Sequence, residues 1–339
     1  MIEERVDEGV DEDFVRQTDP MRRELLAHCY RLLGSVHDAE DLVQETYLRA
    51  WRSYDRFEGK SSLRTWLYRI ATNACLTALE SRGRRPLPTG LGAPSADPGD
   101  PLIERGEVAW LEPVPDGMLG GPRDDPASII ASRASVRLAL IAALQQLPPR
   151  QRAVLVLRDV LQWRAAEVAQ VLDTTTAAVN SALQRARAQL DQAALTEDDI
   201  SEPADADQRE LLDRYVRALE NKDIAAIVQL FTADAIWEMP PFVGWYQGPQ
   251  DIGRLIDTAC PAGAGELRLL PAAGNGQPAF AMYRLGDDGH WHAFQLQVLA
   301  ITRAGIAHVT AFFDLRLFTT FGFPQTLPAE ERAAAVSSA

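Results

Sequence analysis

Cysteine is scarce in this sequence, and its few thiols stand far apart. Cys29, Cys75 and Cys260 form no CxxC pair, which excludes the common zinc and dithiol motifs and predicts reduced core thiols. No apolar run approaches the roughly 18 residues that a membrane span needs, and the acidic residues 1–14 lack the apolar core of a signal peptide. We therefore expect a cytoplasmic protein without a metal site, a cofactor or a membrane partner.

Lysine is also rare, since nearly all basic residues are arginine, and acidic residues exceed basic ones. The sequence has 48 Asp and Glu against 34 Lys and Arg, a formal net charge of −14. This total argues against nucleic-acid binding, but many of the acids gather in runs such as residues 3–13 and 197–202. Because local patches decide binding more than the total charge does, nucleic acid stays open as a partner.

Stretches rich in proline, glycine and aspartate divide the 339 residues into separate parts. Helical periodicity predicts all-α domains over residues 14–85 and 128–195. Between them, residues 86–127 are predicted to form a flexible linker. Residues 208–323 mix helical and β-rich segments. The expected fold class is multidomain, with two helical domains followed by an α+β domain.

Residues 55–85 are the most informative segment, because a glycine-containing loop leads there into a helix with two different sides. At about 100° per residue, apolar side chains between Leu63 and Ala78 share one side. The other side has no acid, and three arginines follow it; the candidate contacts are Arg64, Tyr68, Arg69, Asn73, Arg82, Arg84 and Arg85. Cations bind phosphates and aromatic rings stack on unpaired bases. This side is therefore either an ordinary solvated face or a nucleic-acid contact.

The helix expected to begin at Asp38 has an acidic outer side that carries Asp41 and Glu45. This side is either solvated or a docking surface for a basic partner helix. The opposite side is predicted to be buried and to contain Ala39, Leu42, Val43, Thr46, Ala50 and Trp51.

The second helical domain has the pattern of a helix-turn-helix, with its turn near Asp173. Val168 and Leu172 of the first helix should pack against Val179 and Leu183 of the second. The polar residues of the second helix then face solvent or a DNA groove: Thr176, Asn180, Ser181, Gln184, Arg185 and Arg187. Helical hairpins of this shape also occur without DNA binding, so both interpretations stay open.

Several motifs occur in the order and spacing of a known family. The first 195 residues resemble an extracytoplasmic-function (ECF) sigma factor of the sigma-70 family, through AEDLVQETYLRAW, FEGKSSLRTWLYRIATNACLTAL and LPPRQRAVLVLRDVLQWRAAEVAQVL with AAVNSALQRARAQL. The remaining part resembles a SnoaL-like domain of the nuclear-transport-factor-2-like superfamily, through RYVRALENKDIAAIVQLFTADAIWEMPP and GWYQGPQDI. Together the two parts resemble the ECF sigma factors that carry such a C-terminal domain.

The resemblance implies promoter-specific transcription initiation, with the β′ and β subunits of core RNA polymerase and promoter DNA as partners. It implies that Asp38, Asp41 and Glu45 bind the β′ subunit. The arginine-bearing helix would capture and melt the −10 element, and the second helix of the helix-turn-helix would bind the −35 element. Asn180 and Ala182 depart from the family, because cations are common at those positions.

The linker and the third domain carry further implications of the resemblance. The linker would run towards the polymerase active centre, and residues 110–113 are similar to a motif that contacts the C-terminal domain in related sigma factors. SnoaL-like domains curl a sheet around helices and leave a cone-shaped pocket for a small molecule. The candidate pocket residues, each of which could instead be plain core or surface, are Trp237, Met239, Trp245, Tyr246, His292, Phe294 and Asp314.

Three hypotheses of function follow. In the first, the chain is a sigma factor and not an enzyme, and its C-terminal domain regulates it; a small ligand, an anti-sigma factor or another regulator could take part. In the second, the C-terminal domain is an active hydrolase or isomerase that uses a His/Asp pair such as His292 and Asp314 as general acid and base. In the third, the chain is a helix-turn-helix repressor that binds DNA without polymerase.

Overall fold

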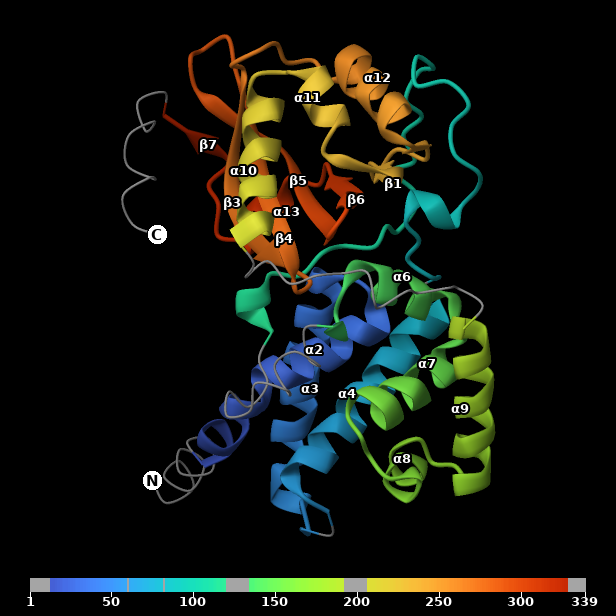
Figure 1. The fold of residues 1–339 in the computed structure, drawn as a ribbon. Helices are drawn as coiled ribbons and strands as arrows, with labels where there is room; N and C mark the ends of the chain where they lie inside the picture. Colours follow the sequence, from blue (N-terminus) through green and yellow to red (C-terminus); the bar gives the residue numbers. More distant parts are fainter. Residues whose placement is uncertain (1–12, 60, 82, 120–133, 192–205, 329–339) are drawn as a thin grey trace, which may run out of the picture. The chain divides into compact units, whose positions relative to one another are not determined.

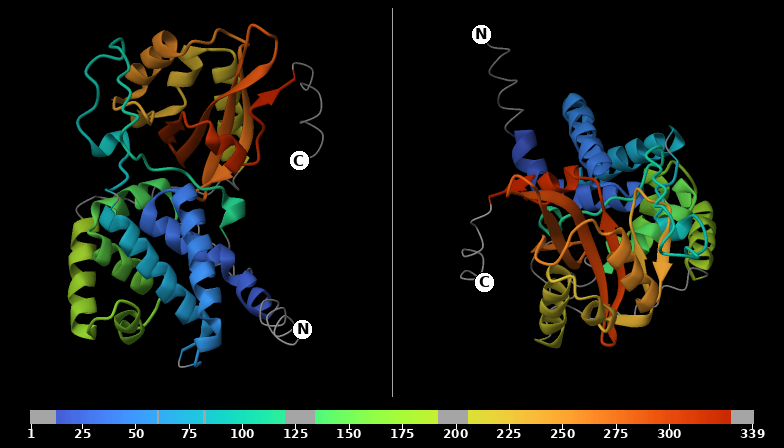
Figure 2. Two further views of the ribbon diagram at one scale, coloured as in Figure 1. Left: turned by 180° about the vertical axis from the view of Figure 1, so that it is seen from behind. Right: turned by 90° about the horizontal axis from the view of Figure 1, so that it is seen from above.

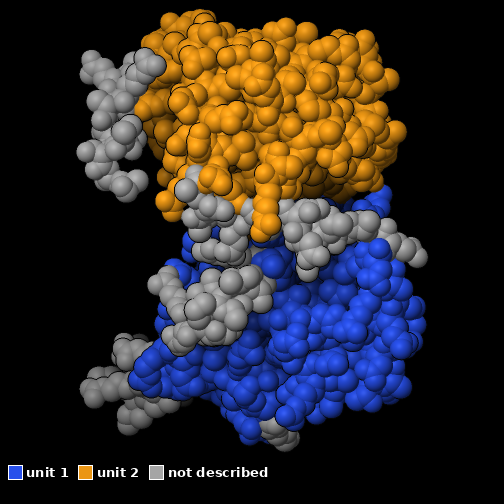
Figure 3. Space-filling model, in the orientation of Figure 1, with its two compact units in different colours: residues 1–85, 116–195 blue, residues 86–115, 196–339 orange. Residues whose placement is uncertain are grey.

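The computed structural model describes five stretches of the chain: residues 13–59, 61–81, 83–119, 134–191 and 206–328. The chain forms two compact units, which Figure 3 shows in different colours. We call residues 1–85 and 116–195 the helical unit, and residues 86–115 and 196–339 the sheet unit. Within the described stretches, no helix combines the length and the apolar character that crossing a membrane requires.

Helices make up the described part of the helical unit (Figures 1 and 2). They are α2 (Arg22–Leu33), α3 (Val36–Arg52), α4 (Leu63–Ser81), α6 (Leu138–Gln146), α7 (Pro149–Leu155), α8 (Ala165–Val171) and α9 (Thr176–Asp191). Short turns complete the path: η1 (Asp19–Met21), η2 (Tyr54–Arg56), η4 (Asp116–Met118) and the π-helical η5 (Val156–Val160).

Local residues set the ends of the first helices. Helix α2 ends at Gly34, whose φ of +69° is left-handed and whose N–H donates to the Tyr30 oxygen at 2.8 Å. The Ser35 hydroxyl then accepts a hydrogen bond from the Asp38 N–H and caps α3, which therefore begins before Asp38, the expected start. The Ser62 hydroxyl accepts from the Thr65 N–H at the start of α4 in the same way.

Helix α3 buries most of the expected side, although Leu42 is only partly buried. Ala39, Val43 and Ala50 are buried, whereas Trp51 is 44% exposed. Trp51 follows Ala50 by about 100° around the helix, which turns its ring away from the side that packs on α2 and α4. The prediction that Trp51 is buried is therefore wrong.

The two halves of the helical unit, α2–α4 and α6–α9, share one core. Arg152 on α7 is buried and donates to the main-chain oxygen of Leu32 on α2 and, at 2.7 Å, to the side-chain oxygen of Gln145 on α6. Arg31 on α2 donates to the Ser135 hydroxyl at 2.7 Å. The stretches predicted as two helical domains thus pack into one compact unit.

A curved sheet forms the centre of the sheet unit. Its strands are β1 (Phe231–Glu238), β2 (Trp245–Gln247), β3 (Leu267–Gly274), β4 (Gln277–Leu285), β5 (Trp291–Thr302), β6 (Gly305–Phe312) and β7 (Thr326–Leu327). They lie in the order β2-β1-β6-β5-β4-β3, and β7 pairs with β5. Strands β1 and β6 are parallel, and the other pairs are antiparallel.

Three helices cover one side of this sheet (Figures 1 and 2): α10 (Ala206–Glu220), α11 (Ile224–Val228) and α12 (Pro249–Ala259). The short helix α13 (Arg316–Thr320) follows β6. Apolar residues of the covering helices, such as Tyr215 and Leu255, pack with strand residues such as Trp237 and Leu299 in a single core. The core therefore lies between the helices and the concave sheet, as expected of an α+β domain.

Residues 86–115, which we call the connecting segment, belong to the sheet unit. Apart from the short turn η3 (Pro88–Gly90) and two isolated β-bridges, the connecting segment has no regular structure. Leu111 and Val114 are nevertheless fully buried, and the Val114 N–H donates to the Asn275 side chain at 3.0 Å. Proline and glycine prevent helices and strands here, but they do not prevent an irregular chain from docking. The rest of the predicted linker, residues 120–127, lies outside the described residues.

Candidate functional site

The candidate DNA-contact side of α4 is only partly open. Arg69 and Asn73 are exposed. The Arg64 side chain is 42% exposed and pairs with Glu24 at 2.9 Å. Tyr68, by contrast, is fully buried. The structure therefore places two of the four predicted helix contacts at the surface and one in the core.

Two aromatic neighbours enclose Tyr68. Its ring centroid lies 4.9 Å from that of His28 on α2 and 5.2 Å from that of Trp163, between η5 and α8. The Arg64 guanidinium lies over the Tyr68 ring at 4.9 Å. Burial, followed by the nearby Glu24 carboxylate, raises the pKa of Tyr68. Helical periodicity could not reveal this enclosure, because Trp163 comes from the helix-turn-helix half.

His28 gives the helical unit a predicted sensitivity to acid. Burial, with a smaller effect of the Arg31 charge, lowers the pKa of His28 from 6.5 to about 3. The unfolded chain therefore binds the extra proton between these two values, and stability falls as the pH falls below 6.5. Between pH 7 and pH 5, we expect His28 to reduce the free energy of unfolding by about 2 kcal/mol. Urea unfolding of the wild type and of His28→Gln at both pH values measures this difference; an equal loss in both proteins would contradict the assignment.

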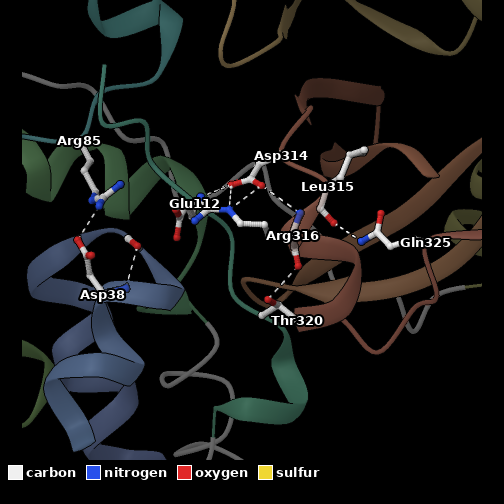
Figure 4. A network of polar contacts seen from close by, with 9 residues as sticks. Asp38, Arg85, Glu112, Asp314, Leu315, Arg316, Thr320 and Gln325 are labelled. Atoms are coloured by element: carbon white, nitrogen blue, oxygen red, sulfur yellow. Dashed lines mark hydrogen bonds and ion pairs between the residues drawn. The ribbon is translucent and has the colours of Figure 1, made fainter. Parts of the chain in front are cut away.

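The residues predicted to bind polymerase have three different environments. Asp41 is exposed. Glu45 accepts a hydrogen bond from Arg49 at 2.7 Å, with both side chains partly exposed. Asp38 pairs with Arg85 at 2.5 Å, and both side chains are largely buried (Figure 4). Two residues that were predicted to bind different partners, polymerase and DNA, thus pair with each other.

Arg84 is the other arginine after α4 that the described stretches include. Arg84 is exposed and donates to the Gln146 side chain at 2.6 Å. Arg82 lies outside the described residues.

Helices α8 and α9 have the expected helix-turn-helix packing. Val168 and Leu172 are buried together with Val179 and Leu183. The turn residue Asp173 has a left-handed φ of +49°, a conformation that glycine adopts most easily and aspartate tolerates. Every residue of α9 that the sequence places towards solvent or a groove is exposed: Thr176, Asn180, Ser181, Gln184, Arg185 and Arg187.

Both exposed arginines of this set form hydrogen bonds within the helical unit. Arg185 donates to the Ser181 hydroxyl at 2.9 Å. Arg187 makes two hydrogen bonds to Asp159, at 2.7 and 2.8 Å. The α9 surface therefore offers hydroxyl, amide and guanidinium groups, the kinds of donor and acceptor that read base edges and phosphates.

The sheet unit contains a cavity of about 230 Å³. Its lining residues are Leu102, Leu219, Trp237, Met239, Phe242, Leu255, Ile256, Ala259, Cys260, Pro261, Leu267, Met282, Phe294, Gln295, Gln297 and Phe313. None of these side chains is acidic, basic or a histidine. Among the described residues, no cluster of three or more His, Cys, Asp and Glu could hold a metal ion.

The predicted pocket residues divide into two groups. Trp237, Met239 and Phe294 line the cavity. The four others do not line it and make contacts elsewhere. The Trp245 ring N–H donates to the Gly92 oxygen, Tyr246 is buried on β2, His292 bonds to Asp288 at 3.0 Å, and Asp314 pairs with Arg316 (Figure 4).

Sequence reasoning missed the carboxylate of Glu238 as the anchor of the connecting segment. This carboxylate is fully buried on β1 and accepts a hydrogen bond from the Thr89 N–H at 3.0 Å. His308 at 2.8 Å and Thr310 at 3.3 Å, both on β6, also contact it. The sequence did carry a signal, namely a glutamate within a strand-like run. A carboxylate that is buried on a strand requires hydrogen-bond donors around it, so other segments must pack against it.

A second contact of the connecting segment lies near α13. Glu112 is largely buried and lies 3.7 Å from the Arg316 guanidinium, which also pairs with Asp314 at 2.6 Å (Figure 4). Glu112 belongs to the short stretch, residues 110–113, that resembles a domain-contacting motif. Within the sheet unit, this stretch does contact the α+β part of the chain.

Known protein families match three parts of this chain. They are sigma-70 region 2 over residues 19–85, sigma-70 region 4 over residues 137–190, and a SnoaL-like domain over residues 212–316. The crystal structure of the extracytoplasmic-function sigma factor SigJ of Mycobacterium tuberculosis superposes with a TM-score of 0.59 and covers 92% of this chain and 99% of that one. At 23% identity, this likeness shows the fold.

Two sigma factors are similar in sequence over most of the chain. The ECF RNA polymerase sigma factor SigG of Mycobacterium tuberculosis is 59% identical over 317 residues, which are 93% of this chain and 85% of the relative. The sequence of SigJ from the same organism is 32% identical over 71% of this chain and 72% of the relative. These matches confirm the resemblance seen in the sequence motifs. This chain therefore belongs to the ECF RNA polymerase sigma factors and carries a C-terminal SnoaL-like domain.

Proposed function

We propose that this sigma factor directs core RNA polymerase to its promoters through α4 and α9, and that the SnoaL-like domain regulates it through the connecting segment. The observation that carries the proposal is the docking of the connecting segment on the sheet unit. This segment joins Arg85, just beyond α4, to the helix-turn-helix half, so the sheet unit holds the chain that links the two DNA-contacting halves.

The burial of Tyr68 explains how the connecting segment could control DNA binding. Trp163 of the helix-turn-helix half covers the Tyr68 ring, and the ring can stack on an unpaired base only after Trp163 moves away. The two halves must then separate, and the length of chain free between them limits how far they go. A docked connecting segment provides less free chain than a released one, so docking favours the closed helical unit.

The surfaces proposed to bind polymerase and DNA consist of the predicted contact residues that are exposed. Asp41 and Glu45 offer acidic groups to a basic surface of the β′ subunit, whereas Asp38 is engaged with Arg85. Arg69 and Asn73 face the −10 element, and the exposed polar residues of α9 face the −35 element. Regulation, and not catalysis, is proposed for the SnoaL-like domain, because the cavity lining has no general acid or base.

Run-off transcription with core polymerase tests the DNA contacts. We expect the double variant Arg69→Ala, Asn73→Ala to lower promoter-dependent RNA about tenfold or more, because each specific contact contributes about 1–3 kcal/mol. The control Arg209→Ala removes an exposed arginine of the sheet unit and should leave RNA synthesis unchanged. Full activity of the double variant with normal binding to core polymerase would exclude these residues as promoter contacts.

A chain that ends at residue 202 tests the regulatory part in the same assay. This chain lacks residues 203–339, so nothing holds the connecting segment, and we expect promoter-dependent RNA to rise by about threefold or more, equivalent to about 0.7 kcal/mol. Unchanged RNA synthesis would remove the regulatory proposal.

A further inference from the structure

The cavity of the SnoaL-like domain has a wall that is apolar almost throughout. Phe313 meets Phe242 and Phe294 edge-to-face, with ring centroids 5.3 and 5.4 Å apart. Charged side chains are absent from the lining, so a carboxylate or an ammonium group that entered would lose its hydration without gaining a partner. The wall therefore selects against ions.

Two hydrogen-bond donors in this wall have no partner among the described residues. They are the ring N–H of Trp237 and the side-chain amide nitrogen of Gln297. The residues are 3% and 0% exposed, respectively. Buried polar groups are nearly always paired, and leaving one unpaired is costly. Two such donors in one cavity wall therefore point to an acceptor that occupies the cavity.

A hydrogen bond to its side-chain oxygen fixes the orientation of the Gln297 amide group. The Tyr215 hydroxyl donates to the Gln297 side-chain oxygen at 2.9 Å. Burial raises the pKa of Tyr215, which keeps this hydroxyl protonated. The neighbouring Gln295 differs, because its amide already donates to the Met282 sulfur at 3.1 Å. The amide of Gln297 is thus held in place for a further hydrogen bond.

We propose that the cavity binds a neutral, mainly apolar ring compound with a single acceptor oxygen, such as a ketone. Trp237 can only donate, so the ligand must accept. A cavity of about 150 Å³ lined by apolar residues can hold benzene, and the volume of about 230 Å³ here suits a somewhat larger ring compound.

The bound compound would touch the connecting segment, because Leu102 is part of the cavity lining. Directly after Leu102 the segment is tied to the loop after β1: the Val243 N–H donates to the Ile103 oxygen at 3.0 Å, and the Arg105 N–H donates to the Pro241 oxygen at 2.9 Å. A ligand that packs against Leu102 strengthens this attachment. This step rests on the proposed regulatory role of the segment.

Calorimetric titration of the full chain with three compounds of similar shape tests the ligand class. Acetophenone is neutral and has an acceptor, ethylbenzene has none, and benzoate is an anion. We expect acetophenone to bind about tenfold more tightly than ethylbenzene, since tenfold corresponds to about 1.4 kcal/mol, the size of one buried hydrogen bond. Benzoate should not bind. Equal binding of acetophenone and ethylbenzene, or tighter binding of benzoate, would overturn the assignment.

Matched variants locate the hydrogen bond. Trp237→Phe and, independently, Gln297→Met should each reduce the preference for acetophenone, while ethylbenzene binding remains. Trp245→Phe is the control, because the Trp245 N–H bonds to Gly92 outside the cavity lining and its loss should not change the preference. Circular dichroism identifies a variant that fails to fold, and the other variant then decides. An unchanged preference in a folded variant would contradict the proposal.

Hydrogen exchange tests the link to Leu102 without polymerase or DNA. Saturating acetophenone should slow exchange of the Arg105 amide about tenfold or more, and Leu102→Ala should abolish most of this slowing. An unaffected Arg105 amide would disprove the link. Because binding and exchange are measured on the isolated chain, they can succeed or fail independently of the transcription tests.

Discussion

Replacing Arg152 with alanine is expected to lower the free energy of unfolding of the helical unit by about 3–5 kcal/mol. The Arg152 guanidinium is buried and donates to four oxygens, which belong to Leu32, Gln145 (main chain and side chain) and Leu147. The substitution leaves these acceptors without their donor and opens a cavity in the core. Both effects act at the contact between the two halves of the unit.

The acceptors of Arg152 explain how a cation is tolerated in this core. Leu32 lies in the last turn of α2, and Gln145 and Leu147 lie at the end of α6. The carbonyl ends of helices carry partial negative charge, which offsets part of the cost of burying the cation. Burial still lowers the pKa of Arg152 from 12.5 to about 10, so the side chain remains protonated at neutral pH.

Native-state hydrogen exchange can measure the Arg152 effect unit by unit. The most protected amides of α2 and α4 should exchange faster in Arg152→Ala, while those of β4 and β5 should not change. Arg150→Ala is a matched control on the same helix, because Arg150 is exposed. A loss below about 1 kcal/mol, the average effect of a point mutation, would show that Arg152 does not join the halves.

Replacing Glu238 with leucine should destabilise the sheet unit by about 2–4 kcal/mol, because the Thr89 N–H, His308 and Thr310 lose a shared acceptor. Thr89 belongs to the connecting segment, so its amide should also exchange much faster. Glu238→Gln, which keeps one carbonyl oxygen, should have an intermediate effect.

The control for Glu238 is Asp234→Leu on the same strand, where the carboxylate is exposed. It should change the stability by less than about 0.5 kcal/mol. If the proposed function is right, Glu238→Leu also raises promoter-dependent RNA, as removal of the sheet unit does. Normal protection of the Thr89 amide in Glu238→Leu would show that this carboxylate does not anchor the segment.

Much of the local structure could be predicted from the sequence because its causes are local. Gly34 ends α2 through a contact within four residues, although Ser35 caps α3 earlier than Asp38, the expected start of that helix. The spacing of apolar residues predicted the helix-turn-helix core around Val179 and Leu183 and the exposed face of α9. Family motifs are also contiguous, so the sigma factor assignment needed no coordinates.

The candidate sites were less predictable because distant segments complete them. Tyr68 lies on the side of α4 that has no acid, yet Trp163 buries it. His292 and Asp314 looked like a catalytic pair, but they lie outside the cavity and pair with other residues. A sequence pattern shows which groups a chain carries, whereas long-range packing decides which of them meet.

The sequence by itself determined the family, the helices and the exposed polar face of α9, because short-range spacing and capping residues encode them. Only the tertiary structure decided that Asp38 meets Arg85, that the connecting segment docks on the sheet unit, and that Trp237 and Gln297 line one cavity. Each of these contacts joins residues far apart in the chain. Their formation depends on how whole elements pack, and that is fixed by burial and hydrogen bonding across the entire unit.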